Sequence, residues 1–296
     1  MESDNKKNLW EKYIGKETYS IKKNYIFSNF VSLTSGNYYF KNVQFTDFGK
    51  TIIKVDNINS NVLFELVLLN NLQTNDNSIV VANCLSFVMF QVNCIELTTK
   101  YIFDTNTSTK QESELCSILN IANTNYSFVS KSKNVTFENI NFSHSNDLIY
   151  YIGAKDSNTY NNCKYMSLDS VQASCILNLQ YGSGIFQNSI LKNVSIDTVF
   201  SLIIFHLNLS YTNFINCQWN KFCEDGRTKS EIFGVNNYFN IANETIIKSI
   251  PSSVGTNGQE TSLSFSIPSP NFKYYTYDLK DDLARYRRYG IKPCKV

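Results

Sequence analysis

Few side chains in this sequence have both the type and the spacing that catalysis needs. Its 296 residues contain only two histidines, His144 and His206, and neither completes a recognisable catalytic triad. His144 lies between two serines and is typical of a polar turn, and His206 lies in a mostly apolar stretch. No CxxC pair occurs among the cysteines, so a zinc site is not expected. The sequence therefore predicts no catalytic residue, no metal site and no cofactor.

Eight cysteines are spread along the chain, most of them among apolar neighbours. Such residues usually pack as small, reduced core side chains. We expect that arrangement for Cys84, Cys94, Cys175 and Cys217, with one or more disulfides as the alternative. Seven N-x-S/T sequons carry little weight, because about this many arise by chance in a chain with 39 asparagines.

Charge and hydropathy exclude several classes of protein. The formal net charge is +2, and the only dense basic cluster lies near residue 287, so no nucleic-acid partner is expected. The N-terminus lacks the apolar stretch of a signal peptide. The most apolar run, 199–209, is too short to span a bilayer. We therefore expect a cytoplasmic protein by default, with non-classical export, cell-surface association or a longer parent chain left open.

A six-residue motif recurs through the sequence. It consists of an apolar residue, any residue, a small polar residue, an apolar, a polar and an apolar residue. Its seven copies are FKNVQF (40–45), LNNLQT (69–74), VNCIEL (92–97), FENINF (137–142), LDSVQA (168–173), LKNVSI (191–196) and FINCQW (214–219). Most copies start 23 to 31 residues apart, and one gap of 45 corresponds to two repeats or to one repeat with a long insertion. This period indicates a stacked repeat protein.

A second motif alternates with the first and has isoleucine in its second position. Its copies are TIIKV (51–55), SIVVA (78–82), SILNI (117–121), LIYYI (148–152), CILNL (175–179), LIIFH (202–206) and EIFGV (231–235). The segments are short, β-branched and aromatic, and they alternate with period two, so we expect strands. We predict an all-β, right-handed, single-stranded parallel β-helix of about seven to eight coils.

The third position of the six-residue motif explains the excess of asparagine. The backbone must bend sharply there, and asparagine tolerates the left-handed conformation better than most residues. Stacked coils would place these amides above one another, so we predict a ladder of hydrogen-bonded side chains. Its predicted members are Asn42, Asn71, Asn139, Asn193 and Asn216.

These bends resemble the second turn of right-handed β-helices of the pectin-lyase type, in which an asparagine ladder lies between the second and third sheets. The resemblance covers about residues 20–250 and concerns the fold alone. The asparagine-rich style is also similar to that of protist β-helix families and polymorphic outer-membrane proteins. The resemblance implies that the isoleucine motif forms the first sheet, the sheet that commonly holds the substrate cleft in this superfamily. It implies no particular activity.

The two ends of the chain differ from the repeat. Residues 1–18 carry Leu9, Trp10, Tyr13 and Ile14 at helical spacing, so we expect an amphipathic helix that caps the first coil. The β-helix is expected over 19–250, and 251–296 is expected to form a cap or a partner-binding tail. Two stretches, 98–115 and 221–231, are expected to be long loops that project from one edge.

The outward row of the first sheet guides the functional prediction. The motif alignment places Asn120, Tyr151 and Asn178 in one outward column of neighbouring coils, an arrangement suited to binding a sugar or an extended peptide. Asp56 is the only carboxylate in the two expected outward rows, whereas glycoside hydrolysis needs two. We therefore expect a non-enzymatic interaction or surface protein that binds a glycan or a protein, of unknown oligomeric state. A divergent or degenerate polysaccharide lyase or glycoside hydrolase is the alternative.

Overall fold

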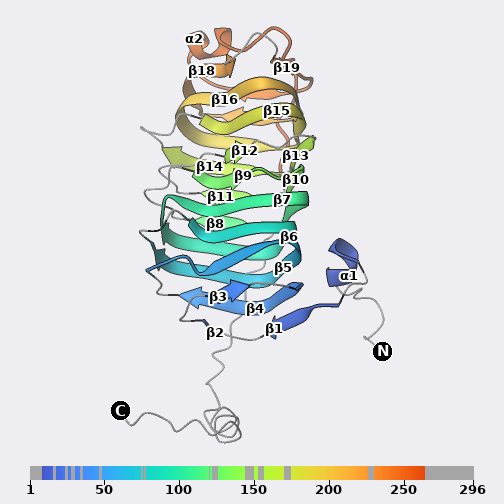
Figure 1. Ribbon diagram of the computed structural model, residues 1–296. Coiled ribbons are helices and arrows are strands. Elements are labelled where there is room, and N and C mark those ends of the chain that lie inside the picture. The colour runs from blue at the N-terminus through green and yellow to red at the C-terminus, as the bar shows by residue number, and fades with distance from the viewer. Residues whose placement is uncertain are drawn as a thin grey trace, which may run out of the picture.

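The chain forms a parallel β-solenoid of about seven turns, as the computed structural model shows (Figure 1). All strands belong to one sheet, and every pairing between named strands is parallel. The predicted all-β solenoid is thereby confirmed. The structure describes residues 9–15, 18–23, 26–27, 31–33, 36–46, 49–74, 76, 78–119, 121, 126–143, 150–152, 157–169, 175–225 and 230–263.

The strands vary from two to 21 residues, because some continue around two corners of a coil. The first half comprises β1 (Ser20–Lys23), β2 (Ile26–Phe27), β3 (Val31–Leu33), β4 (Tyr38–Thr46), β5 (Ile53–Gln73), β6 (Ser78–Thr98), β7 (Tyr101–Glu114), β8 (Ser117–Leu119), β9 (Tyr126–Ser130) and β10 (Asn134–Glu138). The second half comprises β11 (Asn141–Ser143), β12 (Tyr150–Ile152), β13 (Ser157–Asn161), β14 (Lys164–Asp169), β15 (Cys175–Gln187), β16 (Ile190–Ser210), β17 (Asn213–Ile215), β18 (Gln218–Asp225), β19 (Glu231–Phe233) and β20 (Tyr238–Asn240). Two short helices are α1 (Leu9–Tyr13) and α2 (Glu244–Lys248).

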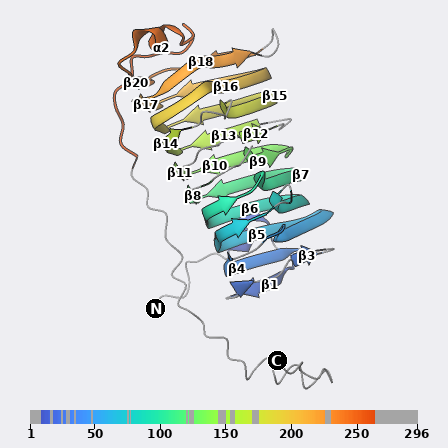
Figure 2. The same ribbon diagram turned by 90° about the vertical axis from the view of Figure 1, so that its left-hand side faces the viewer.

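Each coil has three walls, which the long strand β5 shows in order. Residues 53–57 belong to the first wall, 61–65 to the second and 67–70 to the third. A short link then leads to the first wall of the next coil. The 90° view shows the coils stacked along one axis (Figure 2). In each wall, alternate side chains point into the solenoid because successive residues of a strand face opposite sides.

Stacked aromatic rings fill the interior. Phe137 and Phe142 of the FENINF motif stack on Tyr160 and Tyr165 of the next coil, with ring centroids 5.6 and 5.1 Å apart. Phe40, Phe64 and Phe87 form a similar series of edge-to-face contacts at 5.2 Å. The first and last residues of the motif therefore point inward, as its pattern predicts.

Left-handed backbone marks the corners of the coils. All five asparagines of the predicted ladder have a φ between 50° and 56°. The predicted bend is therefore confirmed. Other residue types also take this conformation, and leucine, glutamine and tyrosine stand at equivalent corners of other coils, at Leu66, Leu115, Gln91 and Tyr211.

The predicted single ladder is wrong, because its five members lie at two different corners. Asn42 and Asn139 lie between the second and third walls, whereas Asn71, Asn193 and Asn216 lie between the third wall and the link. Asn193 is also exposed and not buried. One predicted contact is present, since the Asn216 amide donates to Asn193 Oδ1 at 3.4 Å. The motif recurs at both corners because both need the same left-handed bend.

The stacking of the isoleucine motif also differs from the prediction. SIVVA (78–82) pairs with β7, which starts at Tyr101, and β7 pairs in turn with β9. SILNI (117–121) contributes β8 to the third wall instead, next to residues 93–95. The gap of 45 residues therefore contains two coils. Most of the expected loop 98–115 is strand β7, and the first half of the expected loop 221–231 belongs to β18.

A short helix lies near each end of the stack. Helix α1 lies against the second wall near the N-terminal end of the stack and does not sit over the first coil (Figure 1). There Trp10 is buried against Tyr39, Leu63 and Val88 of three successive coils. At the other end, α2 interrupts the expected β-helix before residue 250. The segment that follows α2 runs back along the coils, and Asn213 Nδ2 donates to the Thr261 carbonyl at 2.6 Å. The rest of the predicted tail, 264–296, lies outside the described residues.

The cysteine prediction is confirmed for the described part of the chain. Cys84, Cys94, Cys175 and Cys217 are buried, and none of the seven cysteines in the described ranges forms a disulfide.

Candidate functional site

The outer face of the first wall carries a compact group of polar side chains near the N-terminal half. Three successive coils each place two side chains there, two residues apart on the strand. The pairs are Lys54 with Asp56, Val81 with Asn83, and Asp104 with Asn106. Thr105 pairs with Ser130 of the next coil, so Lys131 takes the position equivalent to that of Asn106 in that coil. We call the six polar residues, Lys54, Asp56, Asn83, Asp104, Asn106 and Lys131, the first-wall cluster.

The first-wall cluster lines a shallow groove of about 300 Å³. Its amides form a ladder across the coils. Asn83 Nδ2 donates to Asp56 Oδ1 at 2.9 Å, and Asn106 Nδ2 donates to Asn83 Oδ1 at 3.3 Å. These hydrogen bonds hold three side chains in a row parallel to the solenoid axis, at the strand spacing of about 4.8 Å. Polar groups are thus presented at regular intervals along the groove.

Asp104 is the electrostatically distinctive member of the cluster. Partial burial raises its pKa above the usual aspartate value, and the positive charge of Lys131 opposes that shift. Burial is the larger effect, because it removes water that would stabilise the charged carboxylate. A carboxyl group with a raised pKa can hold and donate a proton at a less acidic pH than an ordinary aspartate.

The three predicted binding residues do not form one column. Tyr151 pairs with Asn178 in the next coil, as predicted, but its partner in the preceding coil is Val129. Asn120 itself lies outside the described residues, as does the side chain of Tyr151. The chain neighbour of Asn120, Leu119, pairs with Ile95 on the third wall. The placement of Asn120 beside Tyr151 is therefore wrong, whereas binding at Tyr151 and Asn178 stays a prediction.

Asn178 is half-buried, and its Oδ1 atom is enclosed without a hydrogen-bond partner in the described part of the chain. Among the described side chains, none donates to that atom, whereas Asn83 Oδ1 accepts from Asn106. The better-organised amides therefore lie in the first-wall cluster, several coils away.

Asp104 was missed because the motif alignment placed it in a loop. In the structure YIFDT (101–105) occupies the coil that SILNI was expected to fill. Two carboxylates, Asp56 and Asp104, consequently face the same groove. The signal was present in the sequence, since YIFDT also has isoleucine in its second position.

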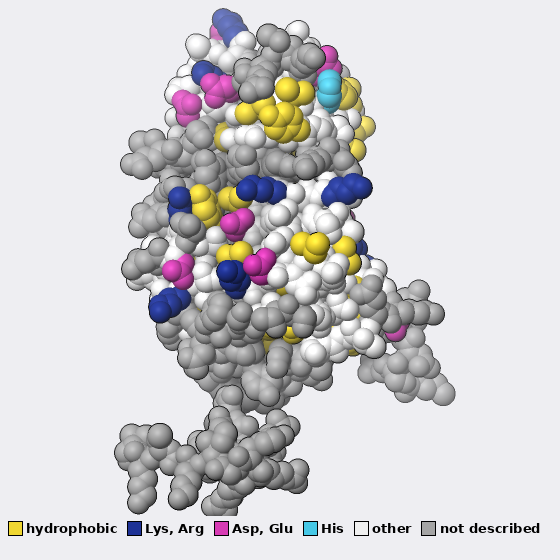
Figure 3. Space-filling model, viewed as in Figure 1, with side chains coloured by type: hydrophobic (Ala, Val, Ile, Leu, Met, Phe, Trp, Pro, Cys, Tyr) yellow, Lys and Arg dark blue, Asp and Glu magenta, His cyan; other side chains and the backbone are white. Residues whose placement is uncertain are grey.

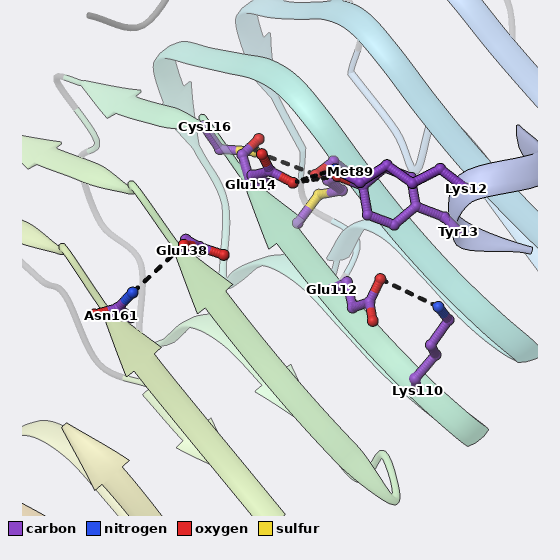
Figure 4. A network of polar contacts seen from close by, with 9 residues as sticks. All are labelled: Lys12, Tyr13, Met89, Lys110, Glu112, Glu114, Cys116, Glu138 and Asn161. Atoms are coloured by element: carbon purple, nitrogen blue, oxygen red, sulfur yellow. Dashed lines mark hydrogen bonds and ion pairs between the residues drawn. The ribbon is translucent and has the colours of Figure 1, made fainter. Parts of the chain in front are cut away.

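A second polar network lies on the second wall, under α1. Tyr13 donates its hydroxyl hydrogen to Glu114, and Lys12 Nζ lies 3.2 Å from the same carboxylate (Figure 4). Glu138 occupies the equivalent position in the next coil, where it accepts from Asn161 at 3.4 Å. Burial and the neighbouring glutamates raise the pKa of Tyr13. These contacts attach α1 to the wall and leave Glu114 partnered.

Charged side chains elsewhere are mixed in sign. Figure 3 shows basic and acidic groups interspersed on one face of the molecule. His206 is exposed on the second wall despite its apolar neighbours in the sequence, and its Nδ1 lies 3.2 Å from a carboxylate oxygen of Glu231. His144 lies outside the described residues. Within the described ranges, no three metal-binding side chains of the His, Cys, Asp or Glu type come together.

Comparison of the chain with protein-family models, with curated proteins and with solved structures gave no match. The likeness to pectin-lyase-type β-helices therefore stays a resemblance of architecture. No helix in the described part of the chain combines the length and apolarity that a membrane span requires.

Proposed function

We propose that this protein is a non-catalytic binding protein and that the first-wall cluster receives an extended glycan. The amide row from Asp56 to Asn106 carries the proposal. It presents hydrogen-bonding groups over two coil spacings, about 10 Å, along a straight line. A linear polymer of hydroxyl-bearing units can follow such a line, whereas a compact ligand contacts only part of it.

The charges of the cluster support a polar ligand. Lys54 and Lys131 lie at opposite ends of the groove, and both are exposed. Each can donate hydrogen bonds to hydroxyl or acidic groups of a glycan, while Asn83 and Asn106 supply amide groups between them. The groove is shallow, so recognition depends on several weak polar contacts and not on enclosure.

A glycan array with the wild-type protein and two variants tests this proposal. We expect Lys54→Ala/Lys131→Ala and Asn83→Ala/Asn106→Ala to lose most of the binding. Ser157→Ala is the matched control, because it removes a solvent-facing hydrogen bond between coils, to Asn134 Oδ1 at 3.1 Å, away from the groove. Glycan binding that survives in both double variants would contradict the proposal.

Divergent glycoside hydrolysis is the second candidate, and the shared groove of Asp56 and Asp104 favours it. The register separates their Cα atoms by two coils and two residues, or about 12 Å. Asp56 leans toward Asn83, in the direction of Asp104. The separation of the two carboxyl groups is therefore closer to that of inverting enzymes, about 6.5–9.5 Å, than to that of retaining enzymes, about 5–5.5 Å.

In this alternative Asp104 donates the proton to the leaving group and Asp56 activates water. The raised pKa of Asp104 suits the first role. The test is release of reducing ends from the polysaccharides that bind. Loss of that release in both Asp104→Asn and Asp56→Asn, with binding retained, would favour the enzyme over the binding protein.

A further inference from the structure

A larger groove lies at the C-terminal end, far from the first-wall cluster. It has a volume of about 780 Å³ and lies between the links of the last coils and α2. The lining residues important here are Asp197, Asn216, Gln218, Trp219, Asn220 and Ile246.

The groove exists because the chain stops building coils at this point. Residues 195–196 of β16 pair with 218–219 of β18, but no strand in the described part of the chain covers the other edge of 218–220. After β20 the chain turns into α2, whose N-cap is Asn243. The helix leaves a gap where the next link would lie.

The walls of this groove are held in place. Trp219 Nε1 donates to Ser249 Oγ at 2.9 Å, which ties the end of α2 to β18. Trp219 is 6% exposed, so only a small part of the residue reaches the groove. Asn220 Nδ2 donates to Asp197 Oδ1 at 2.8 Å, and Thr198 Oγ1 donates to Asp197 Oδ2 at 3.1 Å.

The lining carries a single fixed charge. The hydrogen bond from Asn220, followed by that from Thr198 and the charge of Lys221, lowers the pKa of Asp197, so Asp197 is a carboxylate at neutral pH. The Sγ atom of Cys217, also in the lining, lies 3.3 Å from the Leu191 carbonyl oxygen and 3.4 Å from that of Ile215, either of which can accept its one hydrogen, and burial raises the pKa of Cys217 to about 11. It is therefore neutral. None of the described lining residues is Lys, Arg or His.

This chemistry excludes most classes of ligand. An anionic group would meet the Asp197 carboxylate, because Lys221, whose charge acts on Asp197, lies outside the lining and pairs with Glu224 at 2.8 Å. A calcium ion needs about six to eight oxygen ligands, usually with several carboxylates, and the groove offers one. A purely apolar ligand would remove water from the exposed Gln218 amide and Asp197 carboxylate without replacing its hydrogen bonds, which is costly.

We propose that the groove between β18 and α2 binds a neutral saccharide. Its hydroxyls donate to the Asp197 carboxylate and exchange hydrogen bonds with the amides of Gln218 and Asn220. Its C–H surface packs against Ile246 and the exposed part of Trp219. The site is independent of the proposed function, because it lies on a different part of the coils and shares no residue with the first-wall cluster.

Tryptophan fluorescence gives a direct test, since Trp10 and Trp219 are the only tryptophans. In a Trp10→Phe background, the signal reports Trp219 alone. We expect saturable changes on titration with one or more of mannose, galactose, N-acetylglucosamine and maltose. Galacturonic acid and glucosamine serve as the anionic and cationic probes, and we expect the anionic one to give no response.

Two variants locate the binding. Asp197→Asn keeps the shape of the side chain and removes its charge, and we expect at least tenfold weaker saccharide binding, the usual scale for losing a charged hydrogen-bond partner. Gln218→Ala removes an exposed amide with little risk to folding, and we expect a similar direction of change. Ser157→Ala is the control and should bind as the parent does.

Three results would overturn the proposal. They are no saturable response to any neutral sugar, stronger binding of galacturonic acid or glucosamine than of every neutral sugar, and unchanged affinity in both groove variants. Loss of binding in Asp104→Asn together with unchanged binding in Asp197→Asn would place the saccharide on the first wall instead.

Discussion

Replacing Asn139 by alanine tests whether left-handed corners, and not buried amides, explain the excess of asparagine. Asn139 has a φ of 56° at the corner inside FENINF. Left-handed backbone costs an ordinary residue about 1–2 kcal/mol, and asparagine pays less of that cost. Asn139→Ala should therefore lower the free energy of unfolding by about 1 kcal/mol. Asn139→Gly should change it by less than about 0.5 kcal/mol, because relief of strain offsets the greater flexibility of the unfolded chain.

The reverse experiment is possible at the equivalent corner three coils after Asn139, where Tyr211 stands. Tyr211 has a φ of 52° and is 46% exposed, so its ring contributes limited burial. Tyr211→Asn should stabilise the protein by up to about 1 kcal/mol through relief of backbone strain. A change of this size moves the thermal midpoint by about 2–4 °C in a chain somewhat shorter than this one, so a shift near the lower value is expected.

Thermal and urea unfolding followed by circular dichroism measure these effects. The control is Asn240→Ala, an exposed asparagine in β20 that is not among the left-handed residues. Because solenoids can unfold in stages, the comparison uses midpoints of the same transition in every variant. Equal shifts for Asn139→Ala and Asn240→Ala, or a lower midpoint for Tyr211→Asn, would refute the reasoning.

Three further predictions follow from burial and charge. Asp104→Asn should raise the free energy of unfolding at neutral pH, because the folded-state pKa of the wild-type carboxyl is raised and the wild-type protein loses stability as the pH rises through that pKa. The unfolding midpoints of the two proteins should converge below the unfolded-state pKa of about 3.9, and a difference that stays constant with pH would contradict this. Native protein at pH 8 should leave Cys84, Cys94 and Cys116 unlabelled by a thiol reagent, since burial raises the pKa of Cys84 and Cys116 to about 12, and labelling after unfolding is the control. Trp10→Ala should expose the Tyr39–Leu63–Val88 surface, which limited proteolysis near α1 and binding of a hydrophobic dye would detect, with unchanged cleavage as the opposing result.

The sequence by itself determined the kind of fold. Period-two strands of β-branched and aromatic residues, repeated about every 23 residues, can bury their apolar face only by stacking coil upon coil. The asparagines at corners such as Asn139 also followed from local chemistry, because a left-handed bend depends on the residue itself and its immediate neighbours. The buried cysteines followed from their apolar surroundings.

Only the tertiary structure decided which segments stack. Alternation looks the same on every wall, so SILNI and YIFDT are equally good strands, and coil length does not distinguish them. Equivalent residues are 23 apart between β10 and β13 but 26 apart between β13 and β15. The register is set by backbone hydrogen bonds and by which side chains fill the interior at each level. Those nonlocal contacts placed Asp104 next to Val81 on the first wall, placed Val129 next to Tyr151, and ended the coils at α2, where the C-terminal groove lies.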